Sequence, residues 1–320
     1  MKKKISITIP CYKSQDTITK LTDGIKEEMN KHKEYDYEII LVNDCSPDNT
    51  FEVISNLALN DEHILAYDLS KNFGESSALM AAYSMSSGDY VVRMDDDGEH
   101  DPKYLFNLIN KLEEGYDYVC AKFKNYHHSL YKRIGSKFNY WFLTKMMDIP
   151  SGSIMSSYNV TRRYVIDEIL KYHNPKPYID GMVWAITTRT AFVPIEHGYR
   201  YAGESGYNLR KSISLWLNGV TSFSIKPLRI ASISGMIFAF TGFIIGVIVV
   251  IDKLINPEIS VGWTSTFAMI LFIGGFIMLF LGLIGEYVGR QYLIANQLPQ
   301  YVIRQEVRKQ TKKQGINKRK

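Results

Sequence analysis

The sequence is poor in cysteine, and its cysteines are not arranged to bind a metal or to staple a small fold. Cys11, Cys45 and Cys120 lie far apart, in or beside apolar runs, with no CxxC pair and no Cys/His cluster. This spacing argues against a zinc-binding module and against a disulfide framework. We therefore expect three reduced, buried cysteines, as is usual in the reducing cytoplasm.

The N-terminus lacks the apolar core of a signal peptide. It begins with positive charge, MKKKISITIP, but its apolar stretch is too short and stops at Pro10. We predict a first strand here instead. Internal repeats and low-complexity segments are also missing, apart from the basic C-terminal residues.

Charge is missing from two long stretches, residues 230–251 and 259–285. Each stretch exceeds the ~20 apolar residues that cross a bilayer as a helix. The seven residues between them contain Pro257, so we expect a tight hairpin of two transmembrane helices. The alternative is a pair of buried helices in a soluble protein.

Basic residues flank both ends of this expected hairpin. Lys226 and Arg229 precede the first stretch, and Arg290 follows the second, within a basic tail that we place at residues 289–320. By the positive-inside rule, both ends of the hairpin are expected in the cytoplasm. The tail suits an anionic membrane surface or is simply solvated, and the sequence leaves both alternatives open.

Residues 1–125 alternate between short apolar runs and amphipathic helical stretches. This alternation predicts an α/β fold with a largely parallel sheet and helices on both of its faces. In such sheets ligands bind at the carboxyl ends of the strands. Strands are expected at 5–10, 37–42, 64–69, 89–94 and 116–121, and helices at 14–33, 49–60, 75–86 and 102–114.

Two further stretches, at about 129–147 and 206–220, mix basic and aromatic side chains with a helical period. The pattern is typical of helices that lie in a membrane interface. For the first stretch the alternative is an ordinary amphipathic helix docked on the sheet.

The most acidic segment, VVRMDDDGEHDP, comprises the end of the expected fourth strand and the loop that follows it. Asp95 and Asp97 lie two residues apart, and strand geometry points such residues to the same side. These carboxylates suit Mg²⁺ or Mn²⁺, which bind through one or two carboxylates and substrate phosphates. Glu99 continues the same register, whereas Asp101 precedes a proline and fits a helix N-cap. The alternative for the loop is a solvated acidic turn.

A second polar loop follows the second strand, in EIILVNDCSPDNT. It places Asn43 and Asp44 at the strand end, where a carboxylate can accept a hydrogen bond from a nucleobase N–H. The alternative is a helix-capping loop, which suits Ser46 or Asp48 better than Asp44.

The sequence resembles the family 2 glycosyltransferases that transfer sugars onto polyprenyl phosphates. The resemblance rests on Pro10-Cys11-Tyr12, EIILVNDCSPDNT, LSKNFGESSALMAAYSMSSGDYVVRMDDDGEHDP and RYAGESGYNLRKSISLWLNGVTSFSIKPLR. Dolichyl-phosphate mannose synthase-like enzymes and bacterial bactoprenol glucosyltransferases belong to this family. The resemblance covers nearly the whole chain. It implies a GT-A fold, with a Rossmann-like catalytic domain and a mixed, mostly parallel sheet at 1–228, followed by the two-helix hairpin at 229–288.

The resemblance also implies roles for individual residues. The residues that bind the nucleotide sugar would be Pro10, Tyr12, Asp44, Asp95 and Asp96, although strand register alone gives Asp96 no role. The metal ligands would be Asp95, Asp97 and Glu99. The residues that receive the acceptor phosphate would be Lys122, Arg133, Ser136 and Arg200. The catalytic residues would be Asp97, Arg133 and Arg200. For Lys122 or Arg133 taken alone, the alternative is a contact with lipid headgroups.

Three departures from the family pattern affect the expected site. Gly206 stands where a lysine is usual after GES, so one positive contact is missing unless Arg210 or Lys211 supplies it. Residues 150–157, PSGSIMSS, lack the Asp and Arg of the usual GDFR segment. Asp96, Gly98 and Glu99 replace the usual Ala, Leu and Gln, which makes this loop unusually acidic.

The implied reaction is inverting transfer of a sugar from a nucleotide sugar to undecaprenyl phosphate or a similar lipid, for modification of a cell-surface glycan. A UDP-sugar is the favoured donor, no nucleic acid is expected, and a homo-oligomer stays open. The acceptor phosphate is already an anion, so no general base is required. The alternatives are an enzyme that elongates a polysaccharide and a non-catalytic nucleotide-sugar-binding membrane subunit.

Overall fold

The computed structural model describes residues 2–123, 154, 156–175, 177–196, 226–255 and 262–309. The two expected interfacial helices lie outside these residues. Arg133, Ser136, Arg200 and Gly206 lie outside them as well, so their expected roles stay predictions.

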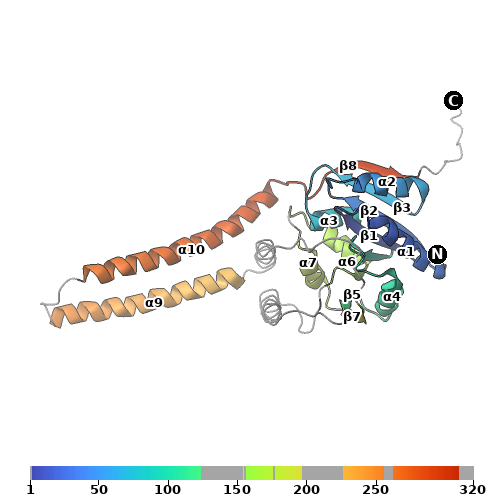
Figure 1. The fold of residues 1–320 in the computed structure, drawn as a ribbon. Coiled ribbons are helices and arrows are strands. Elements are labelled where there is room, and N and C mark those ends of the chain that lie inside the picture. The colour runs from blue at the N-terminus through green and yellow to red at the C-terminus, as the bar shows by residue number, and fades with distance from the viewer. Residues whose placement is uncertain are drawn as a thin grey trace, which may run out of the picture.

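Eight strands among the described residues form one mixed sheet (Figure 1), in the order β7-β5-β6-β4-β1-β2-β3-β8. Strand β6 runs antiparallel to β4 and β5, and β8 runs antiparallel to β3. The other neighbouring strands are parallel. The strands are β1 (Lys4–Cys11), β2 (Asp36–Asn43), β3 (Ile64–Leu69), β4 (Tyr90–Arg93), β5 (Tyr118–Phe123), β6 (Asn159–Arg162), β7 (Thr190–Ile195) and β8 (Ile303–Arg308).

Helices cover both faces of the sheet, because its central strands are apolar on both sides. In β2, Ile39 and Leu41 pack in one core and Ile40 and Val42 in the other. The first core includes side chains from α1 (Ile18–Lys31), α2 (Thr50–Asn60) and α4 (Leu105–Glu113). The opposite face is covered by α3 (Glu75–Met85), α6 (Arg163–Leu170) and α7 (Ile179–Ile186).

The predicted α/β fold with a mixed, mostly parallel sheet is confirmed. The structure differs from the prediction at two element ends that matter for the site. Helix α1 begins at Ile18 rather than Ser14, because residues 14–17 form a turn closed by the Thr17 backbone N–H and the Ser14 carbonyl. Strand β4 ends at Arg93, so Asp95 and Asp97 belong to a loop.

The three cysteines are free thiols. Cys11 and Cys120 are buried, as expected. Cys45 is only part-buried, which corrects the expectation that all three are buried. It lies in the polar loop after β2 and has a positive φ of 50°.

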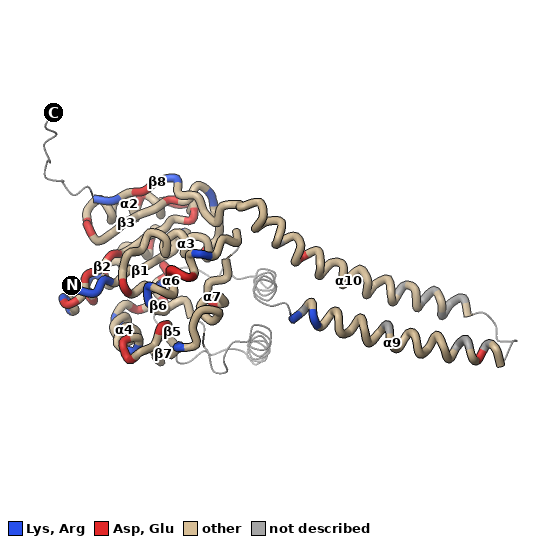
Figure 2. The backbone as a smooth tube through the Cα atoms, turned by 180° about the vertical axis from the view of Figure 1, so that it is seen from behind, with Lys and Arg blue, Asp and Glu red and all other residues tan. Residues whose placement is uncertain are grey.

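Two long helices, α9 (Lys226–Ile255) and α10 (Trp263–Ala295), run side by side away from the sheet domain (Figure 1). Both are long and apolar enough to cross a membrane, and their apolar stretches are not buried by the protein. Phe238 of α9 packs on Phe276 of α10, with ring centroids 4.9 Å apart. On the backbone of the hairpin, charged residues are coloured at both ends of α9 and on the part of α10 nearer the sheet domain (Figure 2). The two charge-free stretches therefore form the predicted helical hairpin.

The chain after the hairpin returns to the sheet domain. The side-chain amide of Gln300 donates to the Tyr172 and Asn174 carbonyls, at 2.6 and 2.8 Å. The Tyr301 hydroxyl donates to the Ser84 hydroxyl at 2.8 Å. Strand β8 then extends the sheet beside β3, which corrects the expectation that residues 303–308 are part of a basic tail. Its sequence, IRQEVR, is short and charged, as is typical of an edge strand.

Candidate active site

Asp44 organises two loops at the carboxyl edge of the sheet. Its backbone N–H donates to the Cys11 carbonyl at 3.0 Å, which joins the ends of β1 and β2. Its carboxylate accepts from the backbone N–H groups of Phe73 and Gly74, at 2.7 and 2.8 Å. Burial raises the pKa of Asp44, and these two hydrogen bonds oppose that rise. Asp44 therefore holds the loop after β3, a role that the sequence did not reveal, and its nucleobase contact stays a prediction.

Asp96 fastens the loop after β1 to the loop after β4. Its carboxylate oxygen Oδ2 accepts from the backbone N–H of Tyr12 at 2.9 Å and from the hydroxyl of Ser14. Burial, together with the neighbouring Asp95 and Asp97, raises the pKa of Asp96 to about 6. Strand register gave Asp96 no role, but the structure shows that it fixes the backbone that carries Tyr12.

Replacing Asp96 should separate this loop-holding role from direct substrate binding. In Asp96→Asn the amide oxygen can still accept from Tyr12 and Ser14, so the KM for the nucleotide sugar should stay within about 3-fold of wild type. In Asp96→Ala both donors lose their acceptor, and the KM should rise about 10-fold. Steady-state kinetics with a varied nucleotide sugar measures both values. Equal losses in the two variants would contradict the loop-holding role.

Asp95 and Asp97 lie in a turn, not in an extended strand. Gly98 has a φ of 82°, and the Glu99 backbone N–H donates to the Asp97 carboxylate at 3.0 Å. The i, i+2 register therefore does not continue to Glu99. Among the residues that the structure describes, no three His, Cys, Asp or Glu side chains are grouped to hold a metal ion. The expected metal role of Asp95, Asp97 and Glu99 stays a prediction. A site built on Asp95 and Asp97 needs its other ligands from substrate or water.

A buried histidine, His100, forms a hydrogen bond with the backbone of Asp95. The Asp95 backbone N–H donates to Nδ1 of His100 at 2.9 Å, so the neutral ring carries its proton on Nε2. Burial lowers the pKa of His100, and its ring stacks on Tyr158 at 5.0 Å. The Ser157 hydroxyl donates to the Asp95 carboxylate at 2.5 Å. These contacts orient Asp95, and the sequence analysis did not single out His100 or Ser157.

A second feature that the sequence analysis missed is a part-buried ion cluster around Arg93, the last residue of β4. Its Nη2 lies 2.6 Å from Glu75 at the start of α3, and its Nη1 lies 3.6 Å from Asp180 at the start of α7. Burial raises the pKa of both carboxylates, whereas Arg93 lowers it. The signal in the sequence was a charged residue inside the apolar strand VVRM. Arg93 thus joins two helix starts to the strand that leads into Asp95.

The other expected site residues are placed as follows. Pro10 is buried in β1 and pairs with Val42. Tyr12 is exposed beside the carboxyl end of the same strand. Lys122 is exposed on β5, and its ammonium lies over the Phe192 ring, 4.5 Å from the centroid. The acceptor-phosphate role of Lys122 stays a prediction.

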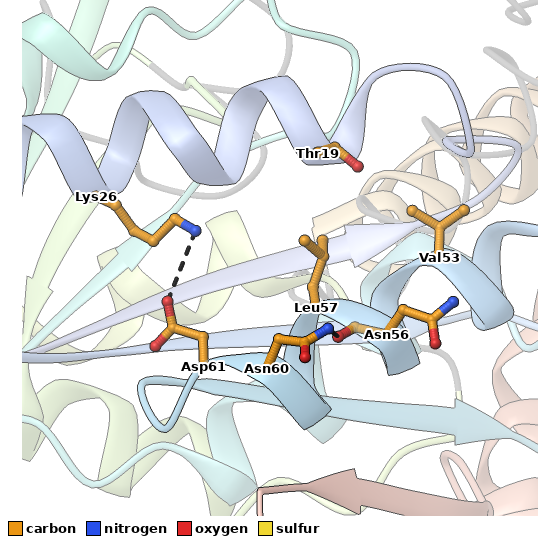
Figure 3. A pocket seen from close by; sticks show the side chains of 7 residues that line it. All are labelled: Thr19, Lys26, Val53, Asn56, Leu57, Asn60 and Asp61. Atoms are coloured by element: carbon orange, nitrogen blue, oxygen red, sulfur yellow. Dashed lines mark hydrogen bonds and ion pairs between the residues drawn. The ribbon is translucent and has the colours of Figure 1, made fainter.

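A surface hollow of about 320 Å³ lies between α1 and α2 (Figure 3). Lys26 and Asp61 face each other across it, with Nζ and Oδ2 3.6 Å apart. Its lining has no cluster of acidic residues. We therefore place the candidate active site at the loops after β1, β2 and β4.

The polar loops at the carboxyl ends of the strands are where α/β enzymes bind ligands, and this sheet is joined to two helices long and apolar enough to cross a membrane. Residues 6–170 match glycosyl transferase family 2, and residues 226–291 match the GtrB C-terminal hairpin. The chain belongs to the family 2 glycosyltransferases and is a glycosyltransferase enzyme.

Curated relatives match along most of the chain. An uncharacterised glycosyltransferase, YkcC of Bacillus subtilis, is 32% identical over 93% of this chain and 92% of its own. The undecaprenyl-phosphate 4-deoxy-4-formamido-L-arabinose transferase of Proteus mirabilis is 31% identical over 95% of this chain and 94% of its own. The enzyme of the same name from Yersinia enterocolitica is 32% identical over 95% of this chain and 94% of its own.

Solved structures share the fold at low identity. Glucosyl-3-phosphoglycerate synthase from Mycobacterium tuberculosis, in complex with Mn²⁺, UDP-glucose and phosphoglyceric acid, has a TM-score of 0.52. It is 16% identical, and the match covers 69% of this chain and 78% of that chain. The likeness supports the GT-A fold.

Proposed function

We propose that the protein transfers a sugar from a nucleotide sugar to undecaprenyl phosphate, with inversion at the anomeric carbon. The proposal rests on one observation: the same chain has an acidic loop at the carboxyl ends of its strands and a helical hairpin that can cross a bilayer. The hairpin segment matches the GtrB type, and several relatives are named as undecaprenyl-phosphate transferases. The product is a lipid-linked monosaccharide for a cell-surface glycan.

The donor side of the site is built on Asp95 and Asp97. Their carboxylates are hard oxygen donors at a strand end, a donor set that fits Mg²⁺ or Mn²⁺ with diphosphate oxygens as further ligands. When bound, such an ion stabilises the negative charge of the departing nucleoside diphosphate. The Asp95 orientation set by His100 and Ser157 fixes one ligand before substrate arrives.

The acceptor side of the site needs positively charged residues to bind the lipid phosphate and does not need a general base. A lipid phosphate is an anion at neutral pH, so its oxygen can attack the anomeric carbon directly, and in-line displacement inverts that carbon. Lys122 and the residues outside the described part, Arg133, Ser136 and Arg200, are proposed to hold this phosphate. Their task is to keep two anionic substrates together in a reactive geometry.

The hairpin would bring this site to the acceptor. Lys226 and Arg229 lie at the start of α9, which by the positive-inside rule supports a cytoplasmic location for the catalytic domain and both chain ends. The phosphate of a long prenyl chain lies at the same surface. The hairpin therefore delivers the lipid substrate as well as anchoring the enzyme.

The proposal is tested with membranes that contain the protein and a panel of radiolabelled nucleotide sugars. The panel includes UDP-glucose, UDP-N-acetylglucosamine and UDP-4-deoxy-4-formamido-L-arabinose, with and without added undecaprenyl phosphate and Mg²⁺. We expect one sugar to enter the chloroform-methanol extract only when the lipid phosphate is present. Label found in a polymer fraction, or bound nucleotide sugar without transfer to any lipid, would overturn the proposal.

A further inference from the structure

Strand β8 contains a β-bulge at Arg304. In the pairing of β3 with β8, Asp68 lies opposite Gln305 and Leu69 lies opposite Ile303, so Arg304 is the additional residue. A bulge of this kind re-aims a side chain at the edge of a sheet. Here the guanidinium of Arg304 forms an ion pair with the carboxylate of Asp68.

The ion pair joins a surface residue to a deeply buried one. The Arg304 side chain is 59% exposed, whereas that of Asp68 is 0% exposed. The second oxygen of Asp68 accepts from the side-chain amide of Asn43 at 2.7 Å. Arg304 is therefore the cation that compensates a carboxylate with no access to water, and Asn43 is the neutral donor.

From Asn43 the hydrogen bonds continue into the two loops of the candidate active site. The side-chain oxygen Oδ1 of Asn43 accepts from the backbone N–H of Ser46 at 3.3 Å. The Ser46 hydroxyl accepts from the backbone N–H of Lys13 at 2.7 Å and donates to Asp48 at 2.5 Å. The Arg304–Asp68 ion pair and these hydrogen bonds together connect β8 to the loops after β1 and β2.

Both loops have a non-glycine residue in the left-handed region. Lys13 has a φ of 60° and Cys45 has a φ of 50°, a conformation that L-residues rarely adopt. Such residues persist where surrounding contacts fix them. The Lys13 N–H bond to Ser46 and the Ser46 N–H bond to Asn43 are contacts of this kind. Tyr12 precedes Lys13 and Asp44 precedes Cys45, so the same contacts set where these two residues lie.

We propose that Arg304 is a positioning residue for the nucleotide pocket, which acts through Asp68 and Asn43 on the loops that carry Tyr12 and Asp44. The inference rests on the proposed function, because it takes Tyr12 and Asp44 to bind the nucleotide of the sugar donor, as the family resemblance implies. Only residues 296–302 separate α10 from β8. The segment that follows the hairpin therefore supports the donor site through Asp68 and Asn43.

The test compares the full-length wild-type protein with the Arg304→Met variant, both in detergent. Binding of UDP and GDP with Mg²⁺ is measured by calorimetry, and kinetics are measured with the nucleotide sugar and the lipid phosphate varied in turn. We expect the Kd for the bound nucleoside diphosphate and the KM for the nucleotide sugar to rise about 5- to 10-fold, because the loops lose their support. The kcat and the KM for the lipid should stay within about 2-fold of wild type.

Two further variants distinguish positioning from folding. Arg304→Met with Asp68→Asn removes the cation and the buried charge together, so it should recover most of the nucleotide affinity. Arg308→Met is the matched control, because Arg308 lies on the same strand, is exposed, and pairs with Glu306. It should bind nucleotide as the wild type does.

The outcomes separate the inference from the proposed function. A lower melting temperature for Arg304→Met with unchanged Kd and KM would overturn the inference alone, since Arg304 would then only stabilise the fold. An equal loss of affinity in the double variant would also overturn it. Failure of the wild type to bind either nucleoside diphosphate would overturn the proposed function, and the inference with it.

Discussion

Replacing Asp97 by asparagine is expected to lower kcat/KM for sugar transfer by about 10² to 10³-fold. The substitution keeps the size of the side chain and an oxygen acceptor for the Glu99 backbone N–H, but it removes a negative charge from the proposed two-carboxylate site. Stabilisation of the departing diphosphate depends on that charge, and losing one such electrostatic contact costs about this much. The measurement is lipid-extractable label from the nucleotide sugar, taken at several Mg²⁺ and Mn²⁺ concentrations.

Asp101→Asn is the matched control for this variant. It removes the same charge from the same loop, but Asp101 accepts from the Lys103 backbone N–H at 3.0 Å and caps a short helical turn. Asparagine caps almost as well as aspartate, so activity should stay within about 2-fold of wild type. Full activity of Asp97→Asn, or an equal loss in Asp101→Asn, would show that Asp97 is not a metal ligand.

The fold could be predicted because its signals are local. Apolar runs such as those of β1 and β2 alternate with amphipathic helices, and this alternation alone indicates a sheet covered on two faces. The hairpin was equally clear, since two charge-free stretches have few other interpretations. Both predictions required only the period and length of hydrophobic segments.

Parts of the site could not be predicted because they depend on turn geometry. The sequence placed Asp95 and Asp97 at a strand end correctly, but the register argument continued past Arg93, where β4 stops. The positive φ of Gly98 then redirects the chain. In this turn the Asp96 carboxylate accepts a hydrogen bond from the backbone N–H of Tyr12. Sequence alone does not reveal which backbone N–H a carboxylate contacts.

Strand β8 could not be predicted because its partner is far away in the sequence. Its charged residues resemble those of a solvated tail, and the same residues are typical of an edge strand. Strands β3 and β8 are separated in the sequence by most of the chain, including the hairpin, so no local pattern indicates that they pair. The buried carboxylate of Asp68 was a weak signal, since a charge inside the apolar strand ILAYDL requires a partner from elsewhere.

Replacing Arg93 by methionine is expected to cost stability and to make stability depend on pH. Without Arg93, the carboxylates of Glu75, Asp180 and Asp95 repel one another and lose the cation that pairs with Glu75 and Asp180. Removing one partner of a fully buried pair costs about 3–5 kcal/mol. Glu75 is 47% exposed, so water screens part of this loss and we expect about 2 kcal/mol. Arg189→Met, which removes an exposed arginine, should change stability by less than about 0.5 kcal/mol.

The pH dependence follows from the direction of the pKa shifts. Burial raises the pKa of Glu75 and Asp180 above their unfolded values, and removal of Arg93 raises both further. A carboxyl with a raised pKa in the folded state favours folding when protonated, and this contribution is lost as the pH rises through that pKa. The deficit of Arg93→Met in melting temperature should therefore be smaller at pH 5 than at pH 8. Glu75→Gln and Asp180→Asn added to Arg93→Met should remove the pH dependence, and a deficit independent of pH would contradict the ion cluster.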